Sequence, residues 1–227
     1  MIAFVIASHG RMKIVLQNIY HLLTMGEVFI VISEEEEYQK IISLFSGFPV
    51  HAYLVNNNPL GNKWQIGVNK AVSFNPSILI TCGSDDFLSI NYIDNATKLL
   101  DKGFDFIGVN GWYMSDGKHH YKAKYKHRKD FPAGSGRVFT KKCLDTIWWD
   151  IFDRKADRLL DDKALLKLKE HKIKTYISQD SEKDGLKVLA LKGKWECLNP
   201  LEKFLKSPTI EISKIANLPS EFPTIDL

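Results

Sequence analysis

Runs of apolar residues and helically spaced apolar positions alternate along the first half of the chain. The apolar-rich runs, which are typical of strands buried on both faces, lie at 2–8, 27–33, 50–55, 77–82 and 104–114. Between them, helical spacing predicts helices over 13–25, 37–47, 63–72 and 91–103. This alternation with short loops predicts an α/β fold whose sheet is mostly parallel and covered by helices.

The second half of the chain is less regular. Its periodicity predicts an alternating segment over 118–129, a strand and helix over 136–149, a helix over 154–172 and a final strand over 173–178. From Ser207 onward, three prolines and little periodicity predict an extended tail that lies on the body or on a partner. We therefore expect one domain over 1–206 and a tail over 207–227.

Composition narrows the class of protein. The 227 residues are 44% hydrophobic, enough for a full core, and a net charge of +4 does not by itself indicate a nucleic-acid-binding protein. Cys82, Cys143 and Cys197 are scattered without a CxxC pair, so neither a disulfide framework nor a zinc site is expected. The sequence has no signal-like segment and no run near the roughly 20 apolar residues of a membrane span. We expect a soluble, cytoplasmic protein without a transmembrane segment.

Polar residues follow four of the predicted strands, at 8–11, 33–34, 56–58 and 84–86. Ligands of open α/β sheets bind beyond the carboxyl ends of the strands, so these residues predict the place of a site. A polar rim of this kind is expected of any α/β protein and does not identify the chemistry. No GxGxxG or GxxxxGK[ST] follows any strand, which counts against dinucleotide binding and against a P-loop.

Four segments resemble a known family. They are "IASHGR", "NNPLGNKWQIGVNKA", "CGSDDFLS", and "PAGSGRVFTKKCLDTI" followed by "LLDDKALLKLKEHK". Each is degenerate alone, but their order and spacing over residues 1 to about 175 resemble GT-A glycosyltransferases, closest to the inverting, nucleotide-sugar-dependent enzymes of family 2. The resemblance implies a GT-A sheet, mixed but mostly parallel, with helices on both faces. It also implies transfer of a sugar from UDP or another nucleoside diphosphate to a carbohydrate or other hydroxyl acceptor.

The family's acidic metal-binding motif matches "GSDDFL", with Gly83 in place of its first aspartate. By this resemblance Asp85 falls on the usual metal position and Asp86 stands beside it. Mn²⁺ or Mg²⁺ would bridge these carboxylates and the diphosphate, and would neutralise the charge that grows as the nucleoside diphosphate leaves. The alternative is that the two aspartates cap the helix that follows.

The family's general base is the aspartate of a Glu-Asp pair at the start of a helix. The matching "LLDDKALL" has Asp161 in place of the glutamate and makes Asp162 the base. Helical spacing places Asp162 between Leu159 and Leu166, on an apolar strip where partial burial would raise its pKa. Asp161 lies three residues after Arg158, which predicts a surface ion pair. Alternatively, both aspartates are solvated and favoured by the helix dipole.

The remaining expectations follow from the same match. Donor and nucleotide contacts are expected from Ser8, His9, Arg11, Glu34, Asn58, Lys63, Trp64, Ser84, Asp85 and Lys192. The sugar or acceptor side is expected at Gly134, Ser135 and Asp161, where glycine lets the backbone approach a ligand closely. The glycine loop is equally consistent with an ordinary turn, and Trp64 with a core residue. Lys192 is placed only by its position after the last predicted strand.

Residues 118–129 hold six Lys or Arg, three His and no acid. Cations alternating with aromatic residues suit single-stranded nucleic acid. The segment also falls where the fold places its acceptor, and a solvated hairpin is the commonest reason for such a run. We expect no nucleic-acid partner.

Two other classes stay open. A nucleotidyltransferase has a similar core, but usually carries a Gly-rich, arginine-containing loop after the first strand, which "SHGRMK" does not match. A non-catalytic module that keeps the fold to bind a nucleotide or sugar is consistent with glycine at position 83.

Overall fold

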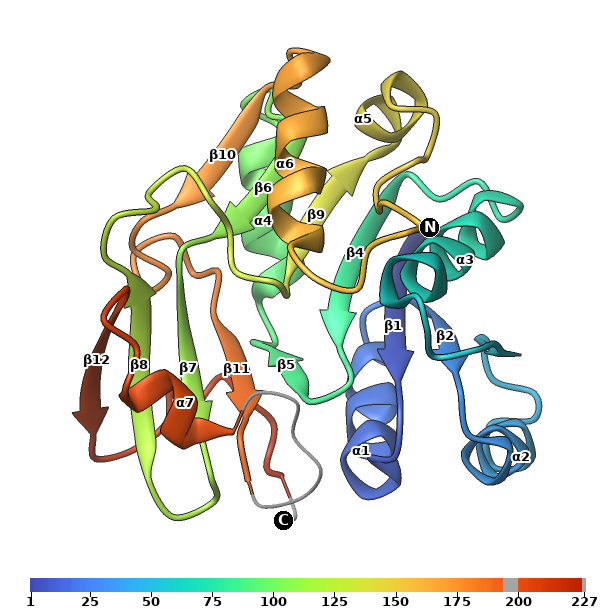
Figure 1. Cartoon of the computed structure of the whole chain (residues 1–227), viewed down its shortest axis with the longest axis horizontal. Coiled ribbons are helices and arrows are strands. Elements are labelled where there is room, and N and C mark those ends of the chain that lie inside the picture. The colour runs from blue at the N-terminus through green and yellow to red at the C-terminus, as the bar shows by residue number, and fades with distance from the viewer. Residues whose placement is uncertain (194–199, 226–227) are drawn as a thin grey trace.

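The chain folds around two β-sheets (Figure 1). The computed structural model describes residues 1–193 and 200–225. Within these residues the larger sheet has seven strands, in spatial order β10 (Thr175–Ser178), β6 (Phe106–Val109), β9 (Arg137–Thr140), β4 (Ile78–Gly83), β1 (Ile2–Ser8), β2 (Glu27–Ile32) and β3 (Val50–Leu54). Neighbouring strands are parallel except at β9, which runs antiparallel to β4 and β6. The expected α/β fold with a mostly parallel sheet is confirmed.

Helices cover both faces of this sheet. The core on one face includes residues of α1 (Met12–Leu23), α2 (Glu35–Leu44) and α4 (Tyr92–Leu100). The core on the other includes residues of α3 (Leu60–Val72), α5 (Lys141–Thr146) and α6 (Leu160–Glu170). Along β1, Phe4 and Ile6 belong to the first core, and Ala3 and Val5 to the second, because successive side chains of a strand point to opposite faces.

The second sheet has five strands among the described residues. Their spatial order is β12 (Ile210–Ile215), β8 (His120–Tyr125), β7 (Gly111–Ser115), β11 (Val188–Leu191) and β5 (Asp86–Leu88), and α7 (Leu201–Leu205) packs on β12. The single strand predicted over 104–114 is wrong, because its residues form β6 and β7 in different sheets. The chain passes between them at Asn110, whose side chain bonds to Tyr125 N (3.1 Å) and to Gln179 (3.0 Å).

The end of the chain also differs from the expectation. The strand expected to be the last, at 173–178, is followed by β11 and β12. β12 lies in the segment expected to form an extended tail, and pairs antiparallel with β8. Beyond it, the ring of Phe222 packs on Tyr113 with ring centroids 5.5 Å apart. The helix predicted over 154–172 begins only at Leu160, after Leu159 in the left-handed region (φ 57°).

Candidate active-site cleft

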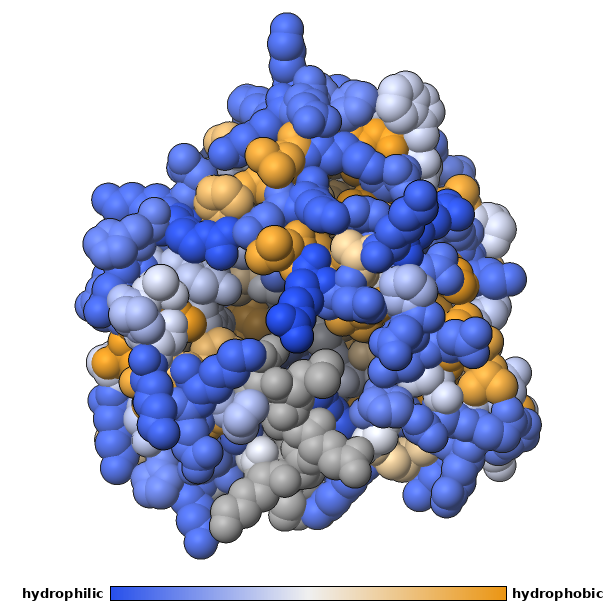
Figure 2. All heavy atoms as spheres, viewed as in Figure 1, coloured by the Kyte–Doolittle hydropathy of each residue, from blue (hydrophilic) through white to orange (hydrophobic). Residues whose placement is uncertain are grey.

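Most of the residues predicted from the sequence line one cleft of about 830 Å³, at the carboxyl ends of β1 and β4. They are Ser8, His9, Arg11, Asn58, Lys63, Trp64, Ser84, Asp85, Asp86, Gly134, Asp161 and Lys192. Figure 2 shows a face of the molecule that is hollowed near its middle, with hydrophilic and hydrophobic residues beside the hollow. The rule that ligands of α/β sheets bind beyond the strand ends thus locates a cavity of suitable size.

A second cavity of about 380 Å³ is lined by four residues of the first, Asp86, Gly134, Asp161 and Lys192. Ser135, expected on the sugar or acceptor side, lines this second cavity. Neither Glu34 nor Asp162 lines either one. Shared walls place the two cavities side by side, so two ligands could meet at the residues they share.

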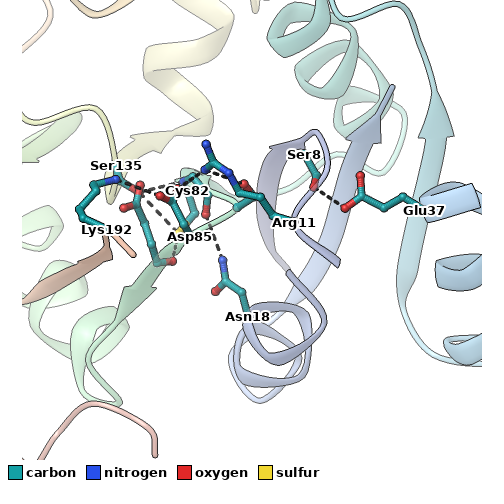
Figure 3. A network of polar contacts seen from close by, with 11 residues as sticks. Ser8, Arg11, Asn18, Glu37, Cys82, Asp85, Ser135 and Lys192 are labelled. Atoms are coloured by element: carbon teal, nitrogen blue, oxygen red, sulfur yellow. Dashed lines mark hydrogen bonds and ion pairs between the residues drawn. The ribbon is translucent and has the colours of Figure 1, made fainter. Parts of the chain in front are cut away.

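Asp85 is held between two cations (Figure 3). Its Oδ1 lies 2.8 Å from Nη1 of Arg11, and its Oδ2 lies 2.9 Å from Nζ of Lys192. All three side chains are about nine-tenths buried, with exposed fractions of 8% for Asp85, 9% for Arg11 and 11% for Lys192. Nη1 of Arg11 also lies 3.5 Å from the Ser84 hydroxyl. We call Arg11, Asp85 and Lys192 the cation clamp.

Pairing between β5 and β11 explains how Lys192 reaches Asp85 across 107 positions of sequence. The antiparallel register sets Ala190 opposite Asp86, and the N–H of Leu191 donates to the Asp85 carbonyl at 2.9 Å. Arg11 comes instead from the loop between β1 and α1. Two separate elements therefore deliver the cations.

Asp86 occupies the space beside Gly83. A side chain at position 83 would lie on the Asp86 carboxylate, so the two positions cannot both carry a carboxylate in this arrangement. Burial, followed by the charge of Asp85, raises the pKa of Asp86 to about 6. The Asp86 carboxylate thus fills the space that a side chain at position 83 would take.

The described residues contain no group of three or more His, Cys, Asp and Glu that could hold a metal ion. One or two carboxylates can suffice for an ion that arrives with a diphosphate, so the number of ligands does not decide the question. The charge beside Asp85 argues against the ion. Both of its oxygens face fixed cations, which would repel an arriving Mn²⁺ or Mg²⁺. The clamp does not fit the predicted ion, and we derive no chemical step through a metal.

Lys63 lines the cleft beside the carboxyl ends of β1 and β2. Its ammonium group donates to the Ser8 carbonyl, to the Ser33 hydroxyl (2.9 Å) and to Oδ1 of Asn57 (3.1 Å). The Ser8 hydroxyl donates to the buried Glu37 at 2.9 Å. Lys63 is itself 1% exposed. Its hydrogen bonds therefore connect the carboxyl end of β1 with the segments that follow β2 and β3.

Two residues predicted to contact the nucleotide lie nearby. His9 is within 2.8 Å of Glu34 and 3.0 Å of the Ser33 hydroxyl, both through Nδ1. The His9 and Glu34 side chains are each 49% exposed. Of this pair only His9 lines the cleft. Glu34 contacts His9 but does not line the cleft itself.

Lys63→Met is expected to change how stability depends on pH above neutrality. Burial lowers the pKa of Lys63 from 10.5 to about 8, so in this window the unfolded chain holds a proton that the folded chain has released. The free energy of unfolding of the parent chain therefore rises with pH relative to the variant, by up to about 3 kcal/mol. Urea unfolding of both proteins between about pH 7.5 and 10 measures the difference. The exposed Lys70→Met on the same helix is the control and should give a flat difference; a flat result for Lys63→Met would contradict the expectation.

The segment before α6 closes one side of the cleft by docking on α3. Oε1 of the buried Gln65 accepts the N–H groups of Ile151 (3.0 Å) and Phe152 (2.9 Å). Gly61 N donates to the Ala156 carbonyl at 2.8 Å, and a side chain at position 61 would overlap that segment's backbone. Trp64 packs against Phe152, with ring centroids 5.5 Å apart, and also lines the cleft. Trp64 therefore packs on the core and also lines the cleft, and its contact with a nucleotide stays a prediction.

Asp161 and Asp162 begin α6 and are each paired with an arginine. Arg137 donates to Oδ1 of Asp161, and Arg128 donates to Oδ1 of Asp162. The predicted pairing of Asp161 with Arg158 is wrong, because the buried Arg137 is its partner. Leu159 and Leu166 are 67% and 52% exposed, so the apolar strip expected around Asp162 is not buried. Asp161, not Asp162, is the carboxylate that lines both cavities.

Three charged residues of the cleft were not singled out as ligand contacts from the sequence: Arg137, Asp157 and Arg158. Arg137 lies in the quoted segment "PAGSGRVFTKKCLDTI", directly after Gly136, and its position beside these glycines was the available signal. Asp157 accepts the N–H of Leu60 at 2.7 Å, an interaction across 97 positions for which the sequence offers no sign.

The basic segment 118–129 forms β8 and the loop after it, which confirms its alternation. Lys122 lies 3.1 Å from Glu182, and Lys124 lies 3.3 Å from Glu211. Arg128 pairs with Asp162 and stacks over Phe131, 4.4 Å from the ring centroid. Much of the positive face is thus matched by acids from other segments. Lys194 and Trp195, in the basic stretch after Lys192, lie outside the described residues.

In the part of the chain that the structure describes, no helix has the length and apolar character needed to cross a membrane.

A scan against models of protein families finds no match, and a search of curated proteins finds none either.

Two solved structures of S. aureus TarS resemble this chain. A structure of TarS residues 1–349 has a TM-score of 0.62 at 12% sequence identity, and covers 84% of this chain and 60% of its own. A longer TarS structure has a TM-score of 0.60 at the same identity, with 84% and 36% covered. This chain therefore spans less than two thirds of either. At this identity the similarity shows the fold, which is that of GT-A glycosyltransferases.

Proposed function

We propose that this chain is an inverting glycosyltransferase that moves a sugar from a nucleotide-diphosphate donor to an acceptor hydroxyl. One observation carries the proposal. A single cleft gathers polar groups around Lys63, the cation clamp, and the carboxylate of Asp161 at the wall shared with a second cavity. These are the groups needed to hold a nucleotide, to hold its diphosphate and to activate an acceptor. The GT-A fold supports the same function.

The second cavity is the proposed acceptor site. Its walls include Trp112, Tyr125 and Phe204, and the Trp112 ring lies 5.1 Å from that of Tyr125 and 6.3 Å from that of Phe204. Aromatic rings offer broad apolar faces beside polar handles, and such pockets suit a carbohydrate or another hydroxyl-bearing molecule. The acceptor would reach the donor sugar at Gly134 and Asp161.

In the proposed step, the acceptor hydroxyl attacks the anomeric carbon of the donor sugar. A new carbon–oxygen bond forms while the bond to the diphosphate oxygen breaks, and that oxygen leaves with the electron pair. The hydroxyl proton passes to Asp161 as general base. Direct displacement inverts the anomeric centre. Arg137 donates a hydrogen bond to Oδ1 of Asp161. The other oxygen, Oδ2, lies beside Gly134, where an added Cβ atom would be 3.2 Å from it.

The sequence resemblance assigned the base to Asp162, and we move the proposal one residue back. A base must come within hydrogen-bond reach of the proton it takes. Asp161 lines both cavities, whereas Asp162 lines neither and is held by Arg128.

Thermal unfolding with a panel of UDP-, GDP-, ADP- and dTDP-sugars tests the donor class. At a hundredfold excess over Kd, a ligand that binds the native state stabilises it by about 2.7 kcal/mol. For a chain of this size, that corresponds to a rise in Tm of roughly 5 °C or more. We expect at least one of these donors to produce such a rise, while the matching free sugars do not. A panel without any rise would contradict the proposal.

A further inference from the structure

We propose that Arg11 and Lys192 hold the donor diphosphate in place of a divalent cation, with Asp85 as their counter-charge, so that binding and transfer need no metal. This inference rests on the proposed function, because it concerns the same donor. It departs from the ion that the sequence resemblance implies, and it assigns Asp85 a different role: the carboxylate orients two cations instead of ligating a metal.

The contacts of Asp85 carry the inference. Each of its carboxylate oxygens faces a different cation, at 2.8 Å from Arg11 and 2.9 Å from Lys192. Figure 3 shows Arg11 and Lys192 reaching Asp85 from different elements. An ion ligated by Asp85 would stand next to both positive side chains, which in a partly buried site repel it strongly. The geometry therefore favours an anion as the next ligand of this site.

The two cations of the clamp carry the same positive charge as the ion that they would replace. Arg11 and Lys192 together carry two positive charges, as Mn²⁺ or Mg²⁺ does. Their heads are fixed by Asp85 before any ligand arrives, so little reorganisation is needed when charge grows on the leaving diphosphate. The planar guanidinium of arginine suits bidentate contact with phosphate oxygens, and lysine acts on them as a point charge.

The position of the clamp is also correct for a diphosphate. Both cations line the cleft that the polar cluster around Lys63 also lines, and Lys192 belongs to the wall shared with the second cavity. Lys192 lines both cavities, and so does Asp161. A donor with its nucleoside near Lys63 and its sugar near Asp161 would thus lay its diphosphate across the clamp.

Isothermal titration with UDP, GDP, CDP, ADP and dTDP tests this inference on the parent chain, in EDTA and again in MnCl₂. We expect at least one of these nucleoside diphosphates to bind in EDTA, with Kd changed less than about threefold by Mn²⁺. Arg11→Met and Lys192→Met should each weaken that binding about tenfold or more, because each removes a charged hydrogen-bond donor.

Lys187→Met is the matched control. Lys187 is 13% exposed and paired with Glu221, much as Lys192 is paired with Asp85, yet it lines neither cavity. Its replacement should leave Kd unchanged.

The outcomes separate the two proposals. Binding that appears only with Mn²⁺, or tightens tenfold or more with it, overturns the clamp and leaves the proposed function standing. No binding in either buffer overturns both. If the clamp variants do not fold, the comparison of EDTA with Mn²⁺ on the parent chain decides alone.

Discussion

Replacing Asp161 with asparagine is expected to lower the rate of nucleoside diphosphate release about a thousandfold or more, with donor affinity changed less than about threefold. General-base catalysis contributes about 10² to 10⁴ to a rate, and asparagine keeps the shape of the side chain but cannot take the proton. The measurement pairs steady-state release from the nucleotide sugar that stabilises the protein with titration of the same donor. Water can serve as the acceptor until a natural acceptor is known.

Asp162→Asn is the matched control for this prediction. It makes the same chemical change one residue later, at a carboxylate that is paired with Arg128 and lines neither cavity. We expect it to lower the rate less than tenfold. The opposite ranking, with Asp162→Asn nearly inactive and Asp161→Asn close to normal, would return the base to the position that the resemblance assigned.

Asp85→Asn should lower the free energy of unfolding by about 3 kcal/mol, because it removes the carboxylate that contacts both of the buried cations Arg11 and Lys192. Urea unfolding at pH 7 in EDTA measures the loss. A saturating nucleoside diphosphate should recover more stability in the variant than in the parent, since an anion then takes over the role of the carboxylate.

Glu211→Gln serves as the control for Asp85→Asn. Glu211 pairs with Lys124 at 3.3 Å, but the two side chains are 59% and 52% exposed. Its replacement should change stability by less than about 0.5 kcal/mol. If Asp85→Asn cost no more than this control, Asp85 would not be balancing the clamp. If it abolished all diphosphate binding in the presence of Mn²⁺, a role as metal ligand would be favoured.

The first half of the fold could be predicted because its signals are local. A strand buried on both faces shows as an apolar run, and the run predicted over 2–8 is observed as β1, Ile2–Ser8. The division of 104–114 between two sheets is marked in the sequence only by Asn110 and Gly111, because β6 and β7 are both buried and the residues on either side of this pair are mostly apolar. β5 has only three residues, too few for a period, and depends on its pairing with β11.

The site shows the same division between local and distant signals. The strand-end rule brought Arg11 and Asp85 to one cleft, because both directly follow strands of the larger sheet. Lys192 was placed by position alone, and its contact with Asp85 depends on the register of β11 against β5. For the proposed base, the resemblance pointed to the pair Asp161 and Asp162. Which of them faces the cleft depends on the helix start after Leu159, and no periodic signal marks that start.

Identification of the reaction products shows whether this chain transfers a sugar from a nucleotide sugar. The nucleotide sugar that raises Tm most is incubated with the protein and with water or a sugar acceptor, and the products are analysed by mass spectrometry. We expect a nucleoside diphosphate and a transferred or released sugar. Release of pyrophosphate would show a nucleotidyltransferase instead, and an unchanged donor despite tight binding would show a module that binds the nucleotide sugar without transferring it.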